Sequence, residues 1–138
     1  MSGDISERCI TIEQCYEFML AYAAQGLPTD EGSKSGGQIR EYLTRAAKAI
    51  SGLAESCATE VNLRHLQSAA QYREYFAVLE RDAQTSLAAI NLVLAQSSIS
   101  SQLIDNLNAS IHLRSLLTDL FLLAEIFKIR SAPVSTPD

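Results

Sequence analysis

Residues 62–96 constrain the fold more than any other part of the sequence, because this long stretch contains neither glycine nor proline. Along this stretch, a set of positions that are nearly all apolar recurs every three or four residues, which is the spacing of one face of an α-helix. The resulting near-heptad stripe consists of Ala69, Tyr72, Phe76, Leu79, Ala83, Ser86, Ile90 and Val93. As a single helix the stretch would be about 50 Å long. The alternative is a break at Arg81 and Asp82, with Asp82 capping a second helix, and periodicity leaves both interpretations open.

Three other segments carry the same helical period. Residues 11–14 have the form of a capping box, which predicts a first helix that starts there and ends at Gly26. A second helix is expected over about residues 38–57. A last helix is expected over about residues 100–130, where a serine provides the N-cap.

No segment shows the apolar–polar alternation of a β-strand, and no internal repeat is present. The sequence therefore predicts an all-α fold, an antiparallel bundle of four or five helices with up-and-down topology. We expect a single domain over residues 1–138, with an ordered core over about 9–130 and flexible tails over 1–8 and 131–138.

The composition indicates a globular protein that binds neither nucleic acid nor membranes. Hydrophobic residues make up 47% of the chain and charged residues 20%, which is enough apolar surface for a core. A net charge of −5 disfavours binding to phosphate backbones. The first residues lack the apolar core of a secretory signal, and the richest apolar run, 116–129, is interrupted by polar and charged residues. We therefore expect a cytoplasmic protein.

Metal-ligating residue types are too few and too scattered for a metal site. Cys9, Cys15 and Cys57 have no Cys-x-x-Cys spacing, and their number is odd. Cys15 and Cys57 fall on apolar stripes, where a thiol is expected to act as a small buried hydrophobe. His65 and His112 belong to no Glu-x-x-His pattern, so the ligands of a di-metal bundle are missing. We expect no metal and no cofactor.

The glycine-rich loop over residues 26–37 has the residue types of a phosphate cradle, directly before the second helix. In a P-loop, however, lysine follows glycine directly, whereas here Ser33 intervenes and no strand precedes the loop. A weak anion site at the helix start remains a hypothesis, and the alternative is a solvated loop. Its residues would be Lys34, Ser35 and Arg40.

Asp119 and Glu125 lie in the most apolar segment of the chain. Because they are six positions apart, they point in directions about 120° from each other and do not form a pair. Each is expected to meet an arginine, such as Arg73 or Arg114, and so fix the register of two packed helices. A catalytic role would require a raised pKa and a cleft.

The last two predicted helices carry more apolar surface than one side of a core requires. In each of them, apolar residues project toward two different sides, and both sides favour burial. We expect a homodimer to cover the surplus; the competing interpretation is a broken helix pair that folds back and buries both stripes internally. The expected interface consists of Leu63, Leu66, Tyr75, Ile104, Leu107, Ile111, Leu116, Leu120 and Leu123.

These patterns favour a small helical interaction module, a regulatory, adaptor or chaperone-like subunit that contacts itself and another protein. No catalytic constellation can be assembled from spacing, so the sequence favours a protein that is not an enzyme. The alternative function is a ligand-binding or catalytic bundle with a small molecule in an interhelical cavity. That cavity would be lined by Tyr16, Met19, Tyr42 and Phe76.

Overall fold

The computed structural model describes residues 3–64 and 69–131, and all regular structure in those two ranges is helical. The helices are α1 (Gly3–Ala24), α2 (Lys34–Ile50), α3 (Leu53–Arg64), α4 (Ala69–Leu94), α5 (Ser101–Ala109) and α6 (His112–Ser131). The prediction of an all-α fold is confirmed. The predicted count of four or five helices is not, because the described residues form six. None of these helices is long and apolar enough to cross a membrane.

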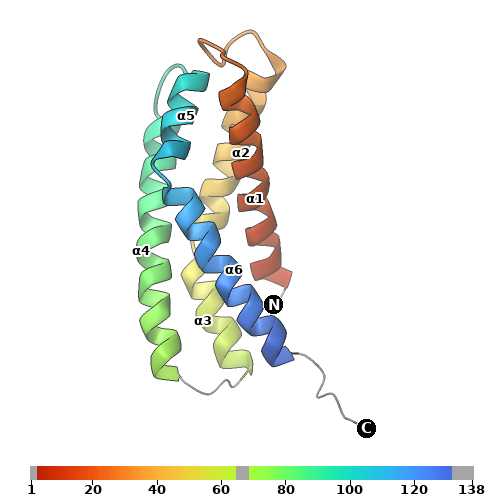
Figure 1. Ribbon diagram of the computed structural model, residues 1–138, viewed down its shortest axis with the longest axis vertical. Helices are drawn as coiled ribbons and strands as arrows, with labels where there is room; N and C mark the ends of the chain where they lie inside the picture. Colours follow the sequence, from red (N-terminus) through yellow and green to blue (C-terminus); the bar gives the residue numbers. More distant parts are fainter. Residues whose placement is uncertain (1–2, 65–68, 132–138) are drawn as a thin grey trace.

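The six helices form four roughly parallel segments, called legs below, that run along the length of an elongated molecule (Figure 1). Helix α1 runs from the lower to the upper end, α2 and α3 descend, α4 returns, and α5 and α6 descend again. Helix α1 packs against α2 and α3 on one side and α5 and α6 on the other. Helix α4 contacts both of these legs as well, so it lies across the core from α1.

The second leg is divided at Gly52, so the prediction of a single helix over residues 38–57 is wrong. Helix α2 stops at Ile50, and Gly52 adopts a left-handed φ of 87° that glycine tolerates without steric cost. The guanidinium of Arg8 in α1 donates hydrogen bonds to the carbonyl oxygens of Ala49 and Ser51, each at 2.9 Å. The break is therefore held by hydrogen bonds from a neighbouring leg.

The fourth leg is divided at Ile111, where the single helix predicted over 100–130 is also wrong. Ile111 has a φ of 60°, a left-handed conformation that is strained for a β-branched residue. Its backbone N–H donates to the carbonyl of Asn108 at 3.1 Å, and the hydroxyl of Ser110 donates to the carbonyl of Leu107 at 2.6 Å. These bonds close the end of α5 before α6 begins.

Neither interpretation of residues 62–96 is correct for the whole stretch, because residues 62–64 belong to α3 and α4 runs from Ala69 to Leu94. Helix α4 passes through Arg81 and Asp82 without a break, so Asp82 is not a cap. The predicted stripe is buried at Tyr72, Leu79, Ala83, Ser86, Ile90 and Val93, and Phe76 is half-buried.

Helix α1 begins at Gly3 rather than at Thr11, so the predicted capping box is wrong. The hydroxyl of Thr11 donates to the carbonyl of Glu7 at 2.9 Å, as in a helix interior. Ile5 is buried, and the flexible tail predicted over 1–8 is therefore wrong for residues 3–8. At the other end, α1 stops at Ala24 close to the predicted position.

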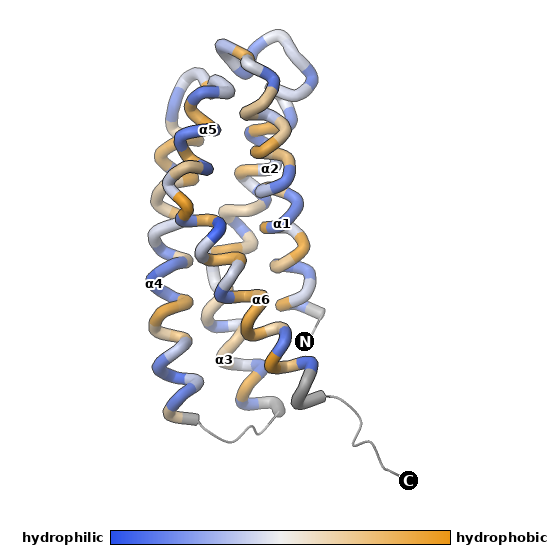
Figure 2. The backbone as a smooth tube through the Cα atoms, viewed as in Figure 1, coloured by the Kyte–Doolittle hydropathy of each residue, from blue (hydrophilic) through white to orange (hydrophobic). Residues whose placement is uncertain are grey.

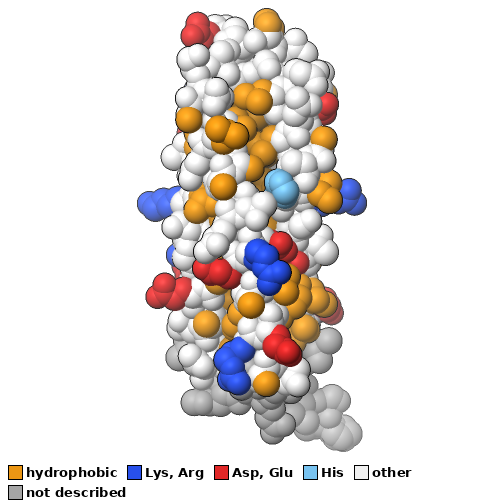
Figure 3. Space-filling model, turned by 90° about the vertical axis from the view of Figure 1, so that its left-hand side faces the viewer, with side chains coloured by type: hydrophobic (Ala, Val, Ile, Leu, Met, Phe, Trp, Pro, Cys, Tyr) orange, Lys and Arg blue, Asp and Glu red, His pale blue; other side chains and the backbone are white. Residues whose placement is uncertain are grey.

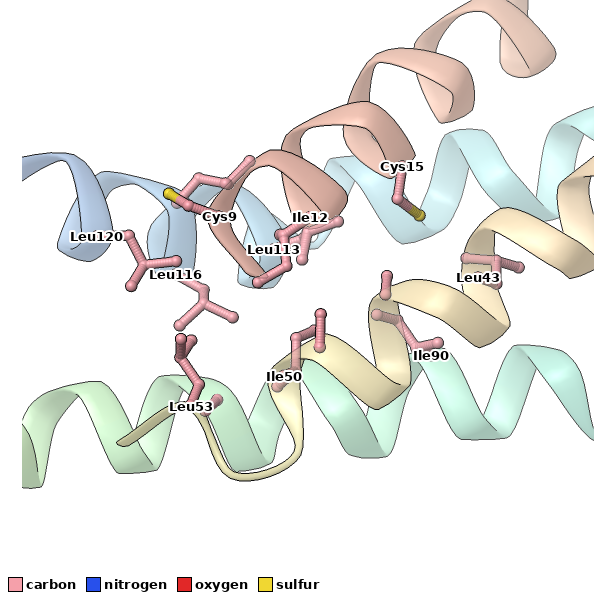
Figure 4. Packing of buried hydrophobic residues seen from close by; sticks show 14 of the residues in the cluster. Cys9, Ile12, Cys15, Leu43, Ile50, Leu53, Ile90, Leu113, Leu116 and Leu120 are labelled. Atoms are coloured by element: carbon pink, nitrogen blue, oxygen red, sulfur yellow. The ribbon is translucent and has the colours of Figure 1, made fainter. Parts of the chain in front are cut away.

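The core runs along the whole bundle, with hydrophobic positions recurring along every helix (Figure 2). In Figure 4, Leu116 of α6 and Leu53 of α3 point toward one another between the legs. Cys9, Cys15 and Cys57 are free and buried, which confirms the prediction made for Cys15 and Cys57.

Candidate functional site on helix α6

Asp119 of α6 meets two side chains of α4 rather than an arginine, so the partner predicted from the sequence is wrong. The hydroxyl of Tyr75 donates to Oδ1 of Asp119 at 3.3 Å. The carboxyl group of Asp82 lines the same surface hollow as Asp119 and raises the pKa of Asp119. Oδ2 of Asp119 is buried and has no hydrogen-bond partner. A carboxyl pair thus connects α4 to α6.

This pair requires a proton, because two ionised carboxylates contain no donor and repel each other. Burial, followed by the hydrogen bond and the charge of Asp82, raises the pKa of Asp119 to about 7. The Tyr75 hydroxyl acts in the opposite direction, since it stabilises the ionised form. Burial and the nearby Asp119 carboxylate raise the pKa of Tyr75 to about 12. The arrangement can therefore hold and release one proton near neutral pH.

Replacing Asp119 with asparagine is expected to remove a pH dependence from the stability. From its ordinary pKa of 3.8 up to about 7, the folded wild type binds a proton that the unfolded chain releases, so the free energy of unfolding falls as pH rises. We expect a loss of about 1–2 kcal/mol between about pH 5 and 8, after a discount for solvent screening of the half-buried group. Asp119→Asn should lack this loss in urea unfolding.

Glu125→Gln is the matched control, because Glu125 is an exposed carboxylate on the same helix. It should retain the slope of the wild type. An Asp119→Asn variant with an unchanged slope would show that the pair does not bind the proton.

The pair borders a shallow, open hollow of about 360 Å³ on the surface of α4 and α6. The hollow is lined by Asp82, Ile111, Arg114, Ser115, Thr118 and Asp119. In the described part of the chain, no cluster of three or more His, Cys, Asp or Glu side chains is placed to hold a metal ion. Burial and the adjacent carboxyl group of Asp82 favour proton binding by Asp119 at the edge of this hollow.

A second hollow, of about 380 Å³, lies between α1 and α6 and is called the α1–α6 groove below. It is lined by Glu13, Tyr16, Glu17 and Leu20 of α1 and by Arg114, Leu117, Thr118 and Phe121 of α6. Leu20 is 49% exposed and Phe121 48%, so each wall of the groove presents a large apolar side chain to solvent. Arg114 and Thr118 line both this groove and the hollow at the carboxyl pair.

Most of the predicted partner interface is not at the surface. Ile104, Leu107, Leu116, Leu120 and Leu123 are buried by the chain itself, with exposed fractions of 9% or less. The reason is the break at Ile111: it lets α5 pack mainly on α1 and α6 mainly on α4, so these five positions are buried against different legs. The broken, back-folded pair is therefore the correct interpretation of the surplus for these five positions.

The remaining interface predictions fall elsewhere. Ile111 is 55% exposed, whereas Tyr75 is half-buried against the core and bonded to Asp119. Leu66 and His65 lie outside the described residues, as does the side chain of Leu63.

The four residues predicted to line a ligand cavity are divided among different contacts in the described part of the chain. Met19 is buried, with its sulfur 3.7 Å from the Cys15 thiol. The Tyr42 ring stacks on that of Phe18 at 4.4 Å between centroids. Phe76 packs beside Tyr72, and Tyr16 lines the α1–α6 groove. The structure does not bring the four together.

The predicted anion site is not assembled either. Lys34 is exposed at the first turn of α2 and Ser35 is half-buried beside it, but Arg40 is committed to the carboxylate of Asp30 at 2.6 Å. Its guanidinium also donates to the carbonyl oxygens of Leu94 and Gln96. Arg40 thus joins two loops at the upper end of the bundle.

The sequence analysis singled out Asp119 because it interrupts an apolar segment, but it considered Asp82 only as the cap of an alternative helix break. Nothing local in the sequence indicates that the two meet, since they lie on different helices. The α1–α6 groove was missed for the same reason. No family model matches the chain, and neither a curated protein nor a solved structure matches it.

Proposed function

We propose that the protein is a small helical interaction module, with a regulatory, adaptor or chaperone-like role, that self-associates through the α1–α6 groove. The scaffold of this module would be an up-and-down bundle of four legs. The observation that carries the proposal is the groove, where Leu20 and Phe121 are each about half exposed between two helices. Covering such side chains is a common reason for soluble chains to associate.

The charges on the two walls of the groove favour a second copy of the chain as its occupant. The α1 wall carries Glu13 and Glu17, and the α6 wall carries Arg114. A twofold axis along the bundle places the α6 wall of each copy opposite the α1 wall of the other. Arg114 of one copy would then face the acidic wall of the other, twice in the dimer, while the apolar side chains meet between them.

Two further observations agree with an interaction role. The four side chains predicted for a ligand cavity take part in separate contacts instead. Other large apolar side chains are exposed on α4 and α6, among them Val78, Leu92 and Leu122, and Figure 3 shows hydrophobic patches separated by charged side chains on the face that includes α4. These patches are where another protein would bind. The three free thiols favour a reducing compartment, which supports the cytoplasm.

Phe121→Asp is expected to leave the protein monomeric but folded. Phe121 is 48% exposed, so an aspartate there remains hydrated in the monomer but is desolvated in a dimer that uses the groove. We expect the dissociation constant to rise by about 30-fold or more, equivalent to about 2 kcal/mol. Sedimentation velocity over a concentration series measures the dissociation constants of the wild type and of the variant.

Leu122→Asp is the matched control, because Leu122 is the next residue of the same helix and is 50% exposed but does not line the groove. It should associate as the wild type does. A charge exchange sharpens the test: Arg114→Glu should weaken the dimer, and adding Glu17→Arg should restore it. A monomeric wild type, or equal effects at positions 121 and 122, would contradict the proposal; a groove that binds a different protein would appear as monomers with Phe121-dependent capture of that partner.

A further inference from the structure

We propose that the Asp82–Asp119 pair is a proton-operated control of the α1–α6 groove, acting through Arg114. This inference rests on the self-association proposed above and specifies how it is regulated. Its geometric basis is that Arg114 and Thr118 line both the hollow at the pair and the groove. Arg114 therefore connects the α6 wall of the groove to the Asp82–Asp119 pair that binds the proton.

The charged and titratable groups that face the pair come from the two helices that form it. Helix α4 contributes Tyr75 and Asp82, and α6 contributes Asp119 and Arg114. Helix α5 adds no charged side chain to the lining of this hollow. Arg114 is exposed, and it is not among the arginines held in the ion pairs that the structure describes. Arg114 lines both hollows.

On the other side, Arg114 faces Glu13 and Glu17 of α1 across the groove. It therefore lies between two acidic neighbourhoods, and the more negative one attracts it more strongly. The carboxyl pair carries one negative charge when it shares a proton and two when that proton has passed to solvent. Among the side chains that line this hollow, Asp119 is the one whose pKa is raised to about 7 by burial and by the adjacent carboxyl group of Asp82.

Loss of the proton should draw Arg114 away from the groove and toward the pair. The α6 wall then loses its positive charge, and the acidic α1 wall of a second copy meets no counter-charge. Uptake of the proton reverses this and returns Arg114 to the groove. Self-association should therefore be stronger on the acidic side of neutrality than on the basic side.

The test is the dissociation constant of the full chain, measured by sedimentation at about pH 6 and about pH 8. For the wild type we expect a constant about tenfold larger at the higher pH. Asp119→Asn should associate tightly at both values, because it cannot gain the second negative charge. Asp82→Asn should behave in the same way and guards against a folding defect in one variant. His112→Gln, which removes the imidazole at the start of α6, should keep the pH dependence of the wild type.

The outcomes separate this inference from the function on which it rests. A wild type that is monomeric at both pH values overturns the proposed function. A wild-type dimer whose constant does not change with pH overturns the control alone, as does a pH dependence that survives in Asp119→Asn or disappears in His112→Gln. As a second readout, the Arg114 Nε resonance of the monomeric Phe121→Asp variant should shift over this pH range, and adding Asp119→Asn should abolish the shift. A resonance that is flat before Asp119→Asn is added overturns the link between the pair and Arg114.

Discussion

Gly36→Ala is expected to lower the free energy of unfolding by about 3 kcal/mol or more, because a Cβ atom at this position has no room. It would overlap the carbonyl oxygen of Asp30 and lie 2.7 Å from the Asp30 Cα. These are backbone atoms, so no side-chain rotation relieves the clash. Asp30 is also fixed from two sides, by the guanidinium of Arg40 at 2.6 Å and by the backbone N–H of Ile99 at 2.7 Å. Relief would require breaking the contact between the two upper loops.

Gly37→Ala is a closely matched control, since it makes the same change at the next residue of the same helix. A Cβ atom there meets nothing within 4 Å. Alanine should therefore stabilise the protein by up to about 1 kcal/mol through its higher helix propensity. Urea unfolding of both variants measures the difference; equal effects at positions 36 and 37 would show that the approach of Asp30 to α2 is not required.

Leu120→Asp is expected to cost about 3–5 kcal/mol and to unfold a large fraction of the molecules. Leu120 is fully buried on α6, in the part of the core that faces α4 and α1. An aspartate at this position must either ionise in an apolar environment or bind a proton, and both are unfavourable. Thermal and urea unfolding at neutral pH should show the loss directly.

Leu122→Asp provides the comparison, because Leu122 is 50% exposed two residues further along the same helix. Its effect on stability should stay within about 0.5 kcal/mol. If Leu120→Asp and Leu122→Asp lowered the free energy of unfolding equally, the face of α6 that carries Leu120 would not be packed against the core. The sequence alone did not distinguish these positions as core and surface, since it assigned Leu120 to an interface with another chain.

The helical period was readable because it depends on local geometry. Positions such as Leu79, Ile90 and Val93 recur at helical spacing, and all three are buried on one face of α4. The break at Gly52 had a local signal as well, because a glycine after a serine commonly ends a helix. The break at Ile111 had none, since a β-branched residue is among the least expected in a left-handed conformation.

The candidate site could not be read from the sequence, because its parts come from separate helices. Asp82 and Asp119 belong to α4 and α6, and their meeting depends on how these two legs pack and on their relative register. The walls of the α1–α6 groove come from opposite ends of the chain. A carboxylate in an apolar segment can be recognised from the sequence, whereas its partner on another helix cannot.

The sequence by itself determined that this protein is all-helical, because helix formation depends on hydrogen bonds and side-chain spacing within one segment. It also determined that Cys15, Cys57 and one face of α4 would be buried. Only the tertiary structure decided that five apolar positions of α5 and α6 expected at an interface are buried within the chain, that Asp82 and Asp119 line the same hollow, and that Leu20 and Phe121 remain exposed. The physical reason is that helical period fixes the direction of a side chain around its own axis, whereas its burial depends on which neighbouring leg covers that direction.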